Sequence, residues 1–235
     1  MSGADQIKVQ AIIAAAGTGT RMKSRQPKPF ILVKGKPILF YSLAVFEKSP
    51  LIHSIVVVAH SSSLKNIEEI VKKFRFKKVV QIIAGGKTRC ESVANGLKVL
   101  DKDADYVAVH DAARPLISRQ TLEEAVKAAW KNSAAVVAVP VKSTIKEVDP
   151  KNLFIQKTLL RDTLWEIQTP QVFRKDILLK AHQAMACYAR CAPTDDAVLV
   201  EKIGVKVKIV RGDYRNIKVT TKEDLAVAEV FLKGS

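Results

Sequence analysis

The chain has 235 residues, of which 48% are hydrophobic, and its 39 basic and 23 acidic residues give a formal net charge of +16. This hydrophobic content excludes a disordered or collagen-like chain, and the length suits a single α/β domain over residues 1–235. The charge favours anionic partners such as nucleotides, sugar phosphates, nucleic acid or anionic lipid, without choosing among them.

No apolar run reaches the roughly 18 residues that a membrane span needs, and the opening sequence MSGADQIKVQ lacks the apolar core of a signal peptide. We therefore expect a soluble, cytoplasmic protein that does not act at a membrane. Cys90, Cys187 and Cys191 are too few and too irregularly spaced for a disulfide framework or a zinc site. We interpret them as incidental thiols.

Short β-branched runs alternate along the chain with amphipathic segments, which is the pattern of parallel strands joined by covering helices. The predicted strands are Val9–Ala14, Ser54–Ala59, Val79–Ile83, Tyr106–His110, Ala134–Val139 and Val205–Val210. The predicted helices are Pro37–Lys48, Ser63–Phe74, Thr88–Leu100, Ser118–Lys131 and Asp195–Ile203. Because strands such as AIIAAA and IVVVA are apolar throughout, we expect both faces of the sheet to be buried. The sequence predicts an open, doubly wound, mostly parallel sheet, which binds ligands at the carboxyl ends of its strands.

Residues 141–164 interrupt this alternation. Two short strand-like pieces flank the turn sequence Asp149-Pro150-Lys151-Asn152, so we predict a projecting β-hairpin arm. Its apolar residues need cover, because an isolated hairpin is only marginally stable in water: they are Ile145, Val148, Leu153, Phe154 and Ile155. Either a partner subunit or the chain's own domain can supply that cover, and the pattern alone leaves both open.

The first predicted strand runs into the sequence AAAGTGTRMKSRQPK, residues 14–28. This stretch contains no Gly-x-x-x-x-Gly-Lys-Ser/Thr string of a Walker loop, and Met22 stands where a dinucleotide fingerprint needs its third glycine. It does contain Gly17 and Gly19, followed by Arg21 and Lys28. Glycines let backbone amides approach phosphate oxygens and the two cations add full charges, so we expect a polyphosphate here. An ordinary strand-to-helix turn is the alternative.

Two more loops follow predicted strands. Residues 85–93, GGKTRCESV, open a helix whose first amides and Ser92 hydroxyl suit an anion or a base edge, although a glycine-rich helix entry explains the same residues. In VHDAARP, Asp111 suits a magnesium ion or a sugar hydroxyl, and Arg114 is close enough to serve the same ligand. The alternative is an Asp–Arg pair that fixes the loop.

The last such loop is NIKVTTKEDL, residues 216–225. Thr221 and Asp224 have the spacing of a helix capping box, which explains both without a binding role. Lys218 precedes this cap, and we expect it to reach a bound phosphate.

Six strings together carry a family resemblance: AAAGTGTRM with PK at 27–28, GGKTRCESVANGL, VHDAARP, LWEIQTPQVF, TDDAVLVEKIG and NIKVTTKEDL. In this order, from about residue 9 to residue 231, they resemble the 2-C-methyl-D-erythritol 4-phosphate cytidylyltransferases of the non-mevalonate isoprenoid pathway. The resemblance implies a Rossmann-like nucleotidyltransferase that transfers CMP from CTP to the acceptor phosphate. The products would be 4-diphosphocytidyl-2-C-methyl-D-erythritol and pyrophosphate, with Mg²⁺ or another divalent cation as cofactor.

The same resemblance implies roles for individual residues. CTP would contact Ala15, Ala16, Gly17, Gly19, Gly86, Arg89 and Ser92, with Arg21, Lys28 and Lys218 as catalytic cations. The acceptor would contact Asp111, Arg114, Thr144, Arg161 and Thr220, with Asp111 also at the metal. Thr144 and Arg161 match arm positions that reach a neighbouring subunit's site, which implies a homodimer formed through residues 141–164.

Three positions depart from the family pattern. Ser143 stands where an acidic residue often precedes the threonine, Pro29 stands where glutamine is common, and Thr221 replaces a usual proline. None removes a charged group assigned to catalysis, but Ser143 adjoins an acceptor-binding position.

Three other functions are alternatives to this one. A ribitol 5-phosphate cytidylyltransferase shares the same loops, although EVDP and IQKTLLRDTLW in the arm resemble the erythritol enzymes more. A basic nucleic-acid-binding module is disfavoured because aromatic residues are only 6% and the lysines are scattered, so we expect no nucleic-acid partner. A nicotinamide dehydrogenase is disfavoured because this sequence lacks the third glycine of the dinucleotide fingerprint and the acidic residue that should follow at the end of a strand.

Overall fold

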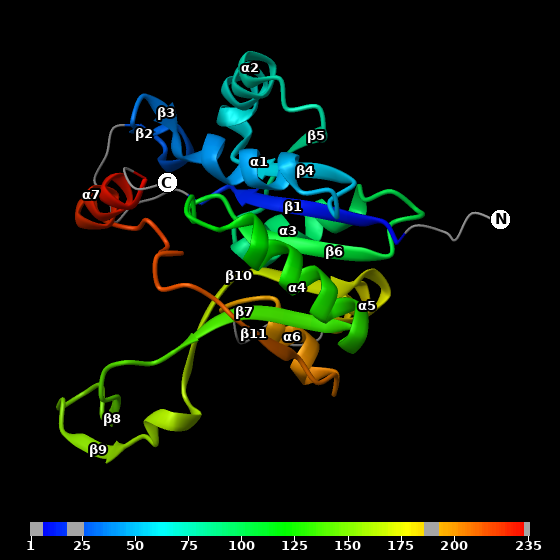
Figure 1. The fold of residues 1–235 in the computed structure, drawn as a ribbon. Helices are drawn as coiled ribbons and strands as arrows, with labels where there is room; N and C mark the ends of the chain where they lie inside the picture. Colours follow the sequence, from blue (N-terminus) through cyan, green and yellow to red (C-terminus); the bar gives the residue numbers. More distant parts are fainter. Residues whose placement is uncertain (1–6, 18–25, 186–192, 233–235) are drawn as a thin grey trace.

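The computed structural model describes residues 7–17, 26–185 and 193–232, and its centre is a seven-stranded sheet of order β11-β7-β10-β6-β1-β4-β5 (Figure 1). The strands are β1 (Val9–Ala15), β4 (Ser54–Ala59), β5 (Val79–Ala84), β6 (Tyr106–Asp111), β7 (Ala134–Pro140), β10 (Trp165–Arg174) and β11 (Lys208–Arg211). β10 is antiparallel to β6 and β7, and the other neighbouring pairs are parallel. The predicted doubly wound, mostly parallel sheet is confirmed.

Helices cover both faces of the sheet. One face carries α1 (Ile38–Lys48), α2 (Leu64–Phe74) and α4 (Arg119–Asn132), and the other carries α3 (Arg89–Lys98), α5 (Lys175–Met185) and α6 (Ala197–Lys202). Along β1, Ala11 and Ile13 pack into the first core while Ile12 packs into the second, and all three are fully buried. Successive side chains of a strand point to opposite faces, so an apolar run such as AIIAAA is buried on both sides.

β10 and α5 lie where the sequence pattern predicted neither a strand nor a helix. The middle of β10 reads Gln168-Thr169-Pro170-Gln171, and its pairing with β7 shifts register between Ile167 and Gln171. Polar residues and a proline are signals against a central strand. Here they are buried between β6 and β7, and their hydrogen bonds connect the loops of the site described below.

The C-terminal helix α7 (Lys222–Phe231) starts at the predicted capping box. Thr221 Oγ1 accepts a hydrogen bond from the Asp224 amide at 3.2 Å, and the Asp224 carboxylate accepts one from the Thr221 amide at 2.9 Å. α7 packs on the small hairpin of β2 (Leu32–Val33) and β3 (Lys36–Pro37), next to the short 3-10 helix η2 (Lys28–Phe30). Just before α7, the Val219 amide bonds to the Ala113 carbonyl at 2.8 Å, which brings Lys218 to the carboxyl end of β6.

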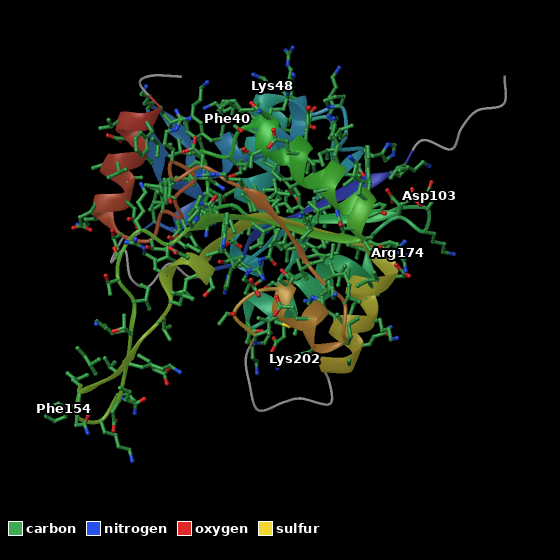
Figure 2. The ribbon with its side chains drawn as sticks, turned by 60° about the horizontal axis from the view of Figure 1, so that its bottom comes forward. Phe40, Lys48, Asp103, Phe154, Arg174 and Lys202 are labelled. Carbon is green, nitrogen blue, oxygen red and sulfur yellow. The ribbon has the colours of Figure 1, made fainter. Side chains whose placement is uncertain are left out.

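The predicted arm is confirmed as a two-stranded hairpin of β8 (Lys146–Val148) and β9 (Ile155–Thr158), standing away from the main sheet (Figure 1). Figure 2 shows Phe154 near its tip, far from the body of the molecule. Leu153, Phe154 and Leu160 are 75%, 71% and 70% exposed. The chain's own domain therefore leaves most of the apolar residues of the arm exposed.

Two further elements complete the described residues: the 3-10 helices η3 (Ser61–Ser63), before α2, and η4 (Arg161–Thr163), between the arm and β10. Within the described ranges, no helix is both long and apolar enough to cross a bilayer.

Candidate active site

Two adjoining cavities open at the carboxyl edge of the sheet. The first, of about 250 Å³, is lined by Ala14, Ala15, Ala16, Gly17, Lys28, Pro29, Ile38, Gly86, Lys87, Thr88, Arg89, Ser92, Asp111, Ala112, Ala113 and Lys218. The second, of about 240 Å³, is lined by Arg89, Asp111, Arg114, Ile167, Gln168, Thr169, Gln171, Thr194, Asp195 and Lys218. Arg89, Asp111 and Lys218 line both. The two cavities therefore meet at a cluster of charged groups.

The end of β1 and the start of η2 form one wall of the first cavity. Ala15, Ala16 and Gly17 leave β1 there, and Lys28 enters it from the other side of the first loop. Gly19 and Arg21 lie outside the described residues. Of the two cations predicted in this loop, the structure thus places Lys28 at the cavity.

The loop from β5 to α3 is packed too tightly for side chains at its glycines. A Cβ at Gly85 would lie 2.7 Å from the Ala16 Cβ, and one at Gly86 would lie 2.3 Å from the Glu91 Cβ. The Ser92 hydroxyl accepts a hydrogen bond from the Gly86 amide at 3.1 Å and donates one to the Thr88 carbonyl at 2.8 Å. The glycines therefore hold this loop against the end of β1, and α3 begins at the cavity wall.

Asp111, at the end of β6, is the centre of the charged cluster. Its Oδ1 accepts from Arg89 Nε at 3.1 Å, and its Oδ2 lies 2.7 Å from Lys218 Nζ. Burial opposes ionisation of this carboxyl, but the charges of Arg89 and Lys218 outweigh it and hold the pKa of Asp111 well below its usual range. Asp111 is therefore a fixed anion between two cations.

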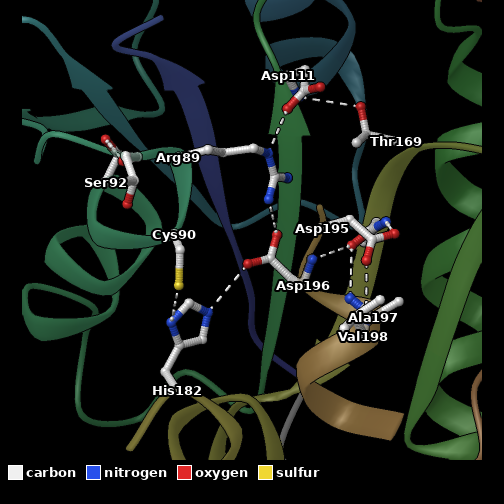
Figure 3. Close-up of polar contacts among 12 residues, drawn as sticks. Arg89, Cys90, Ser92, Asp111, Thr169, His182, Asp195, Asp196, Ala197 and Val198 are labelled. Carbon is white, nitrogen blue, oxygen red and sulfur yellow. Dashed lines mark hydrogen bonds and ion pairs between the residues drawn. The ribbon is translucent and has the colours of Figure 1, made fainter. Parts of the chain in front are cut away.

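Arg89 in turn lies between two carboxylates (Figure 3). Its Nη1 donates to Asp196 Oδ2 at 2.7 Å, on the side opposite its bond to Asp111. Burial disfavours the charged guanidinium, yet the Asp196 and Asp111 carboxylates more than compensate and raise the pKa of Arg89. The resemblance assigned Arg89 to CTP; the structure brings it to both cavities through this double ion pair.

Polar side chains of β10 support the end of β6. The Asp111 amide donates to Thr169 Oγ1 at 3.1 Å, and that hydroxyl lies 2.9 Å from His110 Nδ1. His110 Nε2 is 3.2 Å from the Arg114 carbonyl, and full burial lowers the pKa of His110 to about 4. His110 is thus a neutral, hydrogen-bonded residue of the strand and no acid or base at the cavities.

Arg114 lines the second cavity, where backbone carbonyls fix its guanidinium. Nη1 donates to the Asn216 carbonyl at 2.7 Å and Nη2 to the Ile167 carbonyl at 3.3 Å. Its buried Nε has no hydrogen-bond partner among the residues that the structure describes. Backbone carbonyls thus take two of the five N–H donors of Arg114, which fixes its guanidinium at this cavity with further donors left for a ligand.

Three predicted acceptor residues lie apart from this cluster. Thr220 Oγ1 donates to Asp224 Oδ2 at 2.7 Å, so its hydroxyl is part of the α7 cap. Thr144 and Arg161 are exposed on the arm, where Arg161 Nη1 donates to the Lys142 carbonyl at 3.3 Å. Within the described ranges, none of the three lines either cavity of its own chain.

Asp111 is also the predicted metal residue. In the described part of the chain, no group of three or more His, Cys, Asp or Glu side chains is arranged to hold a metal ion. One carboxylate suits Mg²⁺, which keeps several waters and takes most protein-bound ligands from one or two carboxylates and substrate phosphates. The donor set thus fits magnesium that arrives with a polyphosphate and does not fit a dedicated protein cage.

Comparison with known proteins decides the family. The profile of IspD, 2-C-methyl-D-erythritol 4-phosphate cytidylyltransferase, matches residues 9–234. The enzyme of that name from Caldanaerobacter subterraneus subsp. tengcongensis is 47% identical over 97% of this chain and 100% of its own length. The chain belongs to this cytidylyltransferase family.

Solved structures agree with the assignment. The 4-diphosphocytidyl-2C-methyl-D-erythritol synthase of Anaerococcus prevotii has a TM-score of 0.85 and 32% identity, covering 97% of this chain and 100% of that one. The Francisella tularensis 2-C-methyl-D-erythritol 4-phosphate cytidylyltransferase has a TM-score of 0.79 and 34% identity, covering 95% and 99%. This chain is a CTP-dependent cytidylyltransferase of isoprenoid synthesis, so the predicted family, fold and enzyme class are confirmed. The ribitol phosphate alternative is not favoured.

Several residues around this cytidylyltransferase site were not predicted from the sequence: Thr169, Gln171, His182, Asp195 and Asp196. Four of them lie in the strings LWEIQTPQVF and TDDAVLVEKIG, which carried the resemblance but received no individual role. The signal was the concentration of polar residues, since β10 is a central strand of the sheet. Such residues remain inside a sheet only where partners satisfy them.

Proposed function

We propose that the two cavities divide the substrates of the cytidylyltransferase, with CTP in the first and the polyol phosphate in the second. The first cavity has the backbone amides of residues 15–17, the Gly86 loop and the Lys28 ammonium, which suit a triphosphate and a base edge. The second has the fixed Arg114 guanidinium, together with side-chain hydroxyls and carboxylates that suit a polyol phosphate.

One observation carries this proposal: Arg89, Asp111 and Lys218 line both cavities. A substrate in each cavity would bring the acceptor phosphate and the α-phosphate of CTP together at this cluster. Lys218 is the group best placed to turn to a phosphate, since its side chain is 40% exposed while it pairs with Asp111. The Lys218 ammonium would then bind a phosphate oxygen in place of the Asp111 carboxylate or together with it.

The reaction joins an acceptor phosphate oxygen to the α-phosphorus of CTP and breaks the bond to pyrophosphate. A phosphate monoester has its second pKa at about 6, so the attacking oxygen is largely ionised at neutral pH and needs no general base. This agrees with the buried, neutral state of His110. The chain's task is to hold two anions together, and Lys28, Lys218 and, by its motif, Arg21 supply the cations.

The proposal also includes a magnesium ion at Asp111. Asp111 would hold the ion together with phosphate oxygens of CTP, and the bound ion would neutralise charge on those oxygens. The residues themselves orient the phosphates through Lys28, Lys218 and the amides at the end of β1.

We further propose that the enzyme is a homodimer in which each arm completes the partner's second cavity. The arm holds Thr144 and Arg161 away from the cavities of its own chain and exposes Leu153, Phe154 and Leu160. Exposed apolar residues grouped on one hairpin are typical of an interaction surface. A cytoplasmic location and the absence of nucleic-acid and membrane partners remain predictions.

A substrate panel tests the reaction. The purified protein is given CTP and Mg²⁺ with either 2-C-methyl-D-erythritol 4-phosphate or ribitol 5-phosphate, and pyrophosphate release is followed while the cytidylyl product is identified by mass. We expect turnover with the methylerythritol acceptor and little with ribitol phosphate. Faster turnover with ribitol phosphate would overturn the acceptor assignment, and no pyrophosphate with either would overturn the reaction.

A further inference from the structure

Asp196 is buried next to the site yet lines neither cavity within the described ranges. It is 1% exposed and is the N-cap residue of α6, directly after Asp195, which does line the second cavity. A buried carboxylate is costly unless charges and hydrogen bonds satisfy it. The contacts of Asp196 therefore show what stabilises its buried carboxylate and which residues it can affect.

The carboxylate of Asp196 is held on both oxygens. Oδ2 accepts from Arg89 Nη1 at 2.7 Å, and Oδ1 lies 3.2 Å from His182 Nε2. On the other side of the imidazole, His182 Nδ1 is 3.8 Å from the Cys90 sulfur, so Nε2–H is the donor to Asp196 when the thiol donates to Nδ1 (Figure 3). The side chains of α5 and α3 thus fix Asp196 from below the site.

The backbone at Asp196 is fixed as well. Gln171 Oε1 accepts from the amides of Asp196 and Ala197, both at 3.1 Å, while Gln171 Nε2 donates to Asp195 Oδ2 at 2.9 Å. A central strand therefore determines where the Asp196 carboxylate meets Arg89.

We propose that Asp196, supported by His182, is a positioning residue for phosphoryl transfer that acts only through Arg89. Asp196 holds the Nη1 end of the guanidinium, which leaves Nε directed at Asp111 Oδ1 and leaves Asp111 Oδ2 to Lys218. Without Asp196, Arg89 has one ionic anchor, and Asp111 has a mobile partner at the point where the cavities meet. The inference rests on the proposed function, because the positioned groups are those assigned to the reacting phosphates.

Asp196→Asn and Asp196→Ala test the role. Asparagine keeps the shape and an oxygen for Arg89 but removes the charge, while alanine removes both. We expect turnover to fall about tenfold in Asp196→Asn and up to about 100-fold in Asp196→Ala, by analogy with groups that orient ligands from behind. The dissociation constant of CTP, measured by calorimetry, should change less than turnover, because Asp111 still holds Arg89 at the first cavity and only the orientation of Arg89 at the reacting phosphates is lost.

Asp176→Asn is the matched control. It removes one carboxylate from the exposed Arg174–Asp176 pair, at 2.6 Å, and should leave turnover unchanged. His182→Phe should give a smaller loss of turnover than Asp196→Ala, and His182→Gln, which restores a donor, should recover part of it.

A structural readout separates positioning from folding. The Nε–H signal of Arg89 in a ¹H–¹⁵N spectrum, identified by its loss in Arg89→Lys, should be sharp in the parent and broadened in both Asp196 variants. Parental turnover together with an unchanged Arg89 signal in Asp196→Asn would overturn the proposal. If Asp196→Ala does not fold, Asp196→Asn decides. If the parent itself is inactive, the proposed function fails while the Arg89 signal still tests the positioning.

Discussion

The carboxyl edge of the sheet and the projecting arm differ in whether the chain's own residues satisfy their side chains. At the edge, the buried Asp111 and the half-buried Arg89 are charges with ionic partners from β6, α3 and the segment before α6. On the arm, Leu153 and Phe154 are apolar and exposed. The edge can arrange its charges with the chain's own residues, whereas the arm cannot bury its own apolar ones. The difference supports the proposals that the edge carries the chemistry and that the arm completes the site of a second subunit.

The largest expected effect lies at the edge. Lys28→Ala removes a cation from the first cavity, and turnover should fall by about 10²–10³, as when one preorganised donor to a developing anion is lost. Steady-state pyrophosphate release measures it. Lys127→Ala, at an exposed position of α4, is the control and should keep parental turnover. Near-normal turnover in Lys28→Ala would contradict the assignment of this cavity to the triphosphate.

A second prediction asks whether the edge and the arm act in different subunits. Lys218→Ala and Arg161→Ala should each lose about 10²-fold in turnover. Mixed dimers contain one Lys218→Ala subunit and one Arg161→Ala subunit and are purified by two different tags. They should recover about half of the parental activity, because one of their two sites then has both Lys218 and the partner's Arg161. Activity is measured per dimer after tandem purification.

The control for this experiment uses two variants at the edge. A mixed dimer of Lys28→Ala and Lys218→Ala has one damaged residue in each site and should stay inactive, because both residues line the same cavity of their own chain. Recovery in this control, or none in the first mixture, would contradict the action of Arg161 across the interface.

The third prediction concerns the apolar side of the arm. Phe154→Asp should raise the dimer dissociation constant by about 10- to 100-fold, since a desolvated charge would replace an aromatic anchor. Sedimentation measures the dissociation constant, and activity should become dependent on protein concentration. Val230→Asp provides a matched exposed apolar position on α7, 63% exposed, and should not alter association. Equal weakening by both substitutions would argue against an arm-specific interface.

The body of the fold was predictable because its strands and helices follow simple periodicities. Runs such as residues 55–59 are buried on both faces and therefore apolar throughout. β10 was not predictable in the same way, because Gln168, Thr169 and Gln171 make a buried central strand look like a loop. Their burial depends on partners distant in the sequence, such as Asn216 for Gln168 and Asp195 for Gln171.

In the candidate site, too, the parts carried by local motifs were predictable and the contacts between distant residues were not. Local motifs predicted that loops bearing Lys28, Ser92, Asp111 and Lys218 would meet, because parallel strands end at one edge of the sheet. The link from Arg89 to Asp196 joins residues more than 100 positions apart, and no local pattern indicates it. Thr220 was assigned by likeness alone, and its hydroxyl is bonded to the cap of α7.

The smallest expected effect is on stability in acid, where Asp111 differs from the uncharged arm residues. Its pKa is depressed in the folded protein relative to about 3.9 in an unfolded chain, so its contribution is complete above about pH 4 and is lost as the pH falls below that value. His110, whose folded pKa is about 4, contributes a loss between about pH 6.5 and 4 in the parent, and because the Asp111 charge raises this pKa, the loss extends to lower pH in the variant and offsets part of the Asp111 difference. Asp111→Asn should therefore lose less stability than the parent only below about pH 4, by on the order of 2 kcal/mol. Urea unfolding at successive pH values measures this, and parallel curves below pH 4 would show that the Arg89 and Lys218 pairs do not set the ionisation of Asp111.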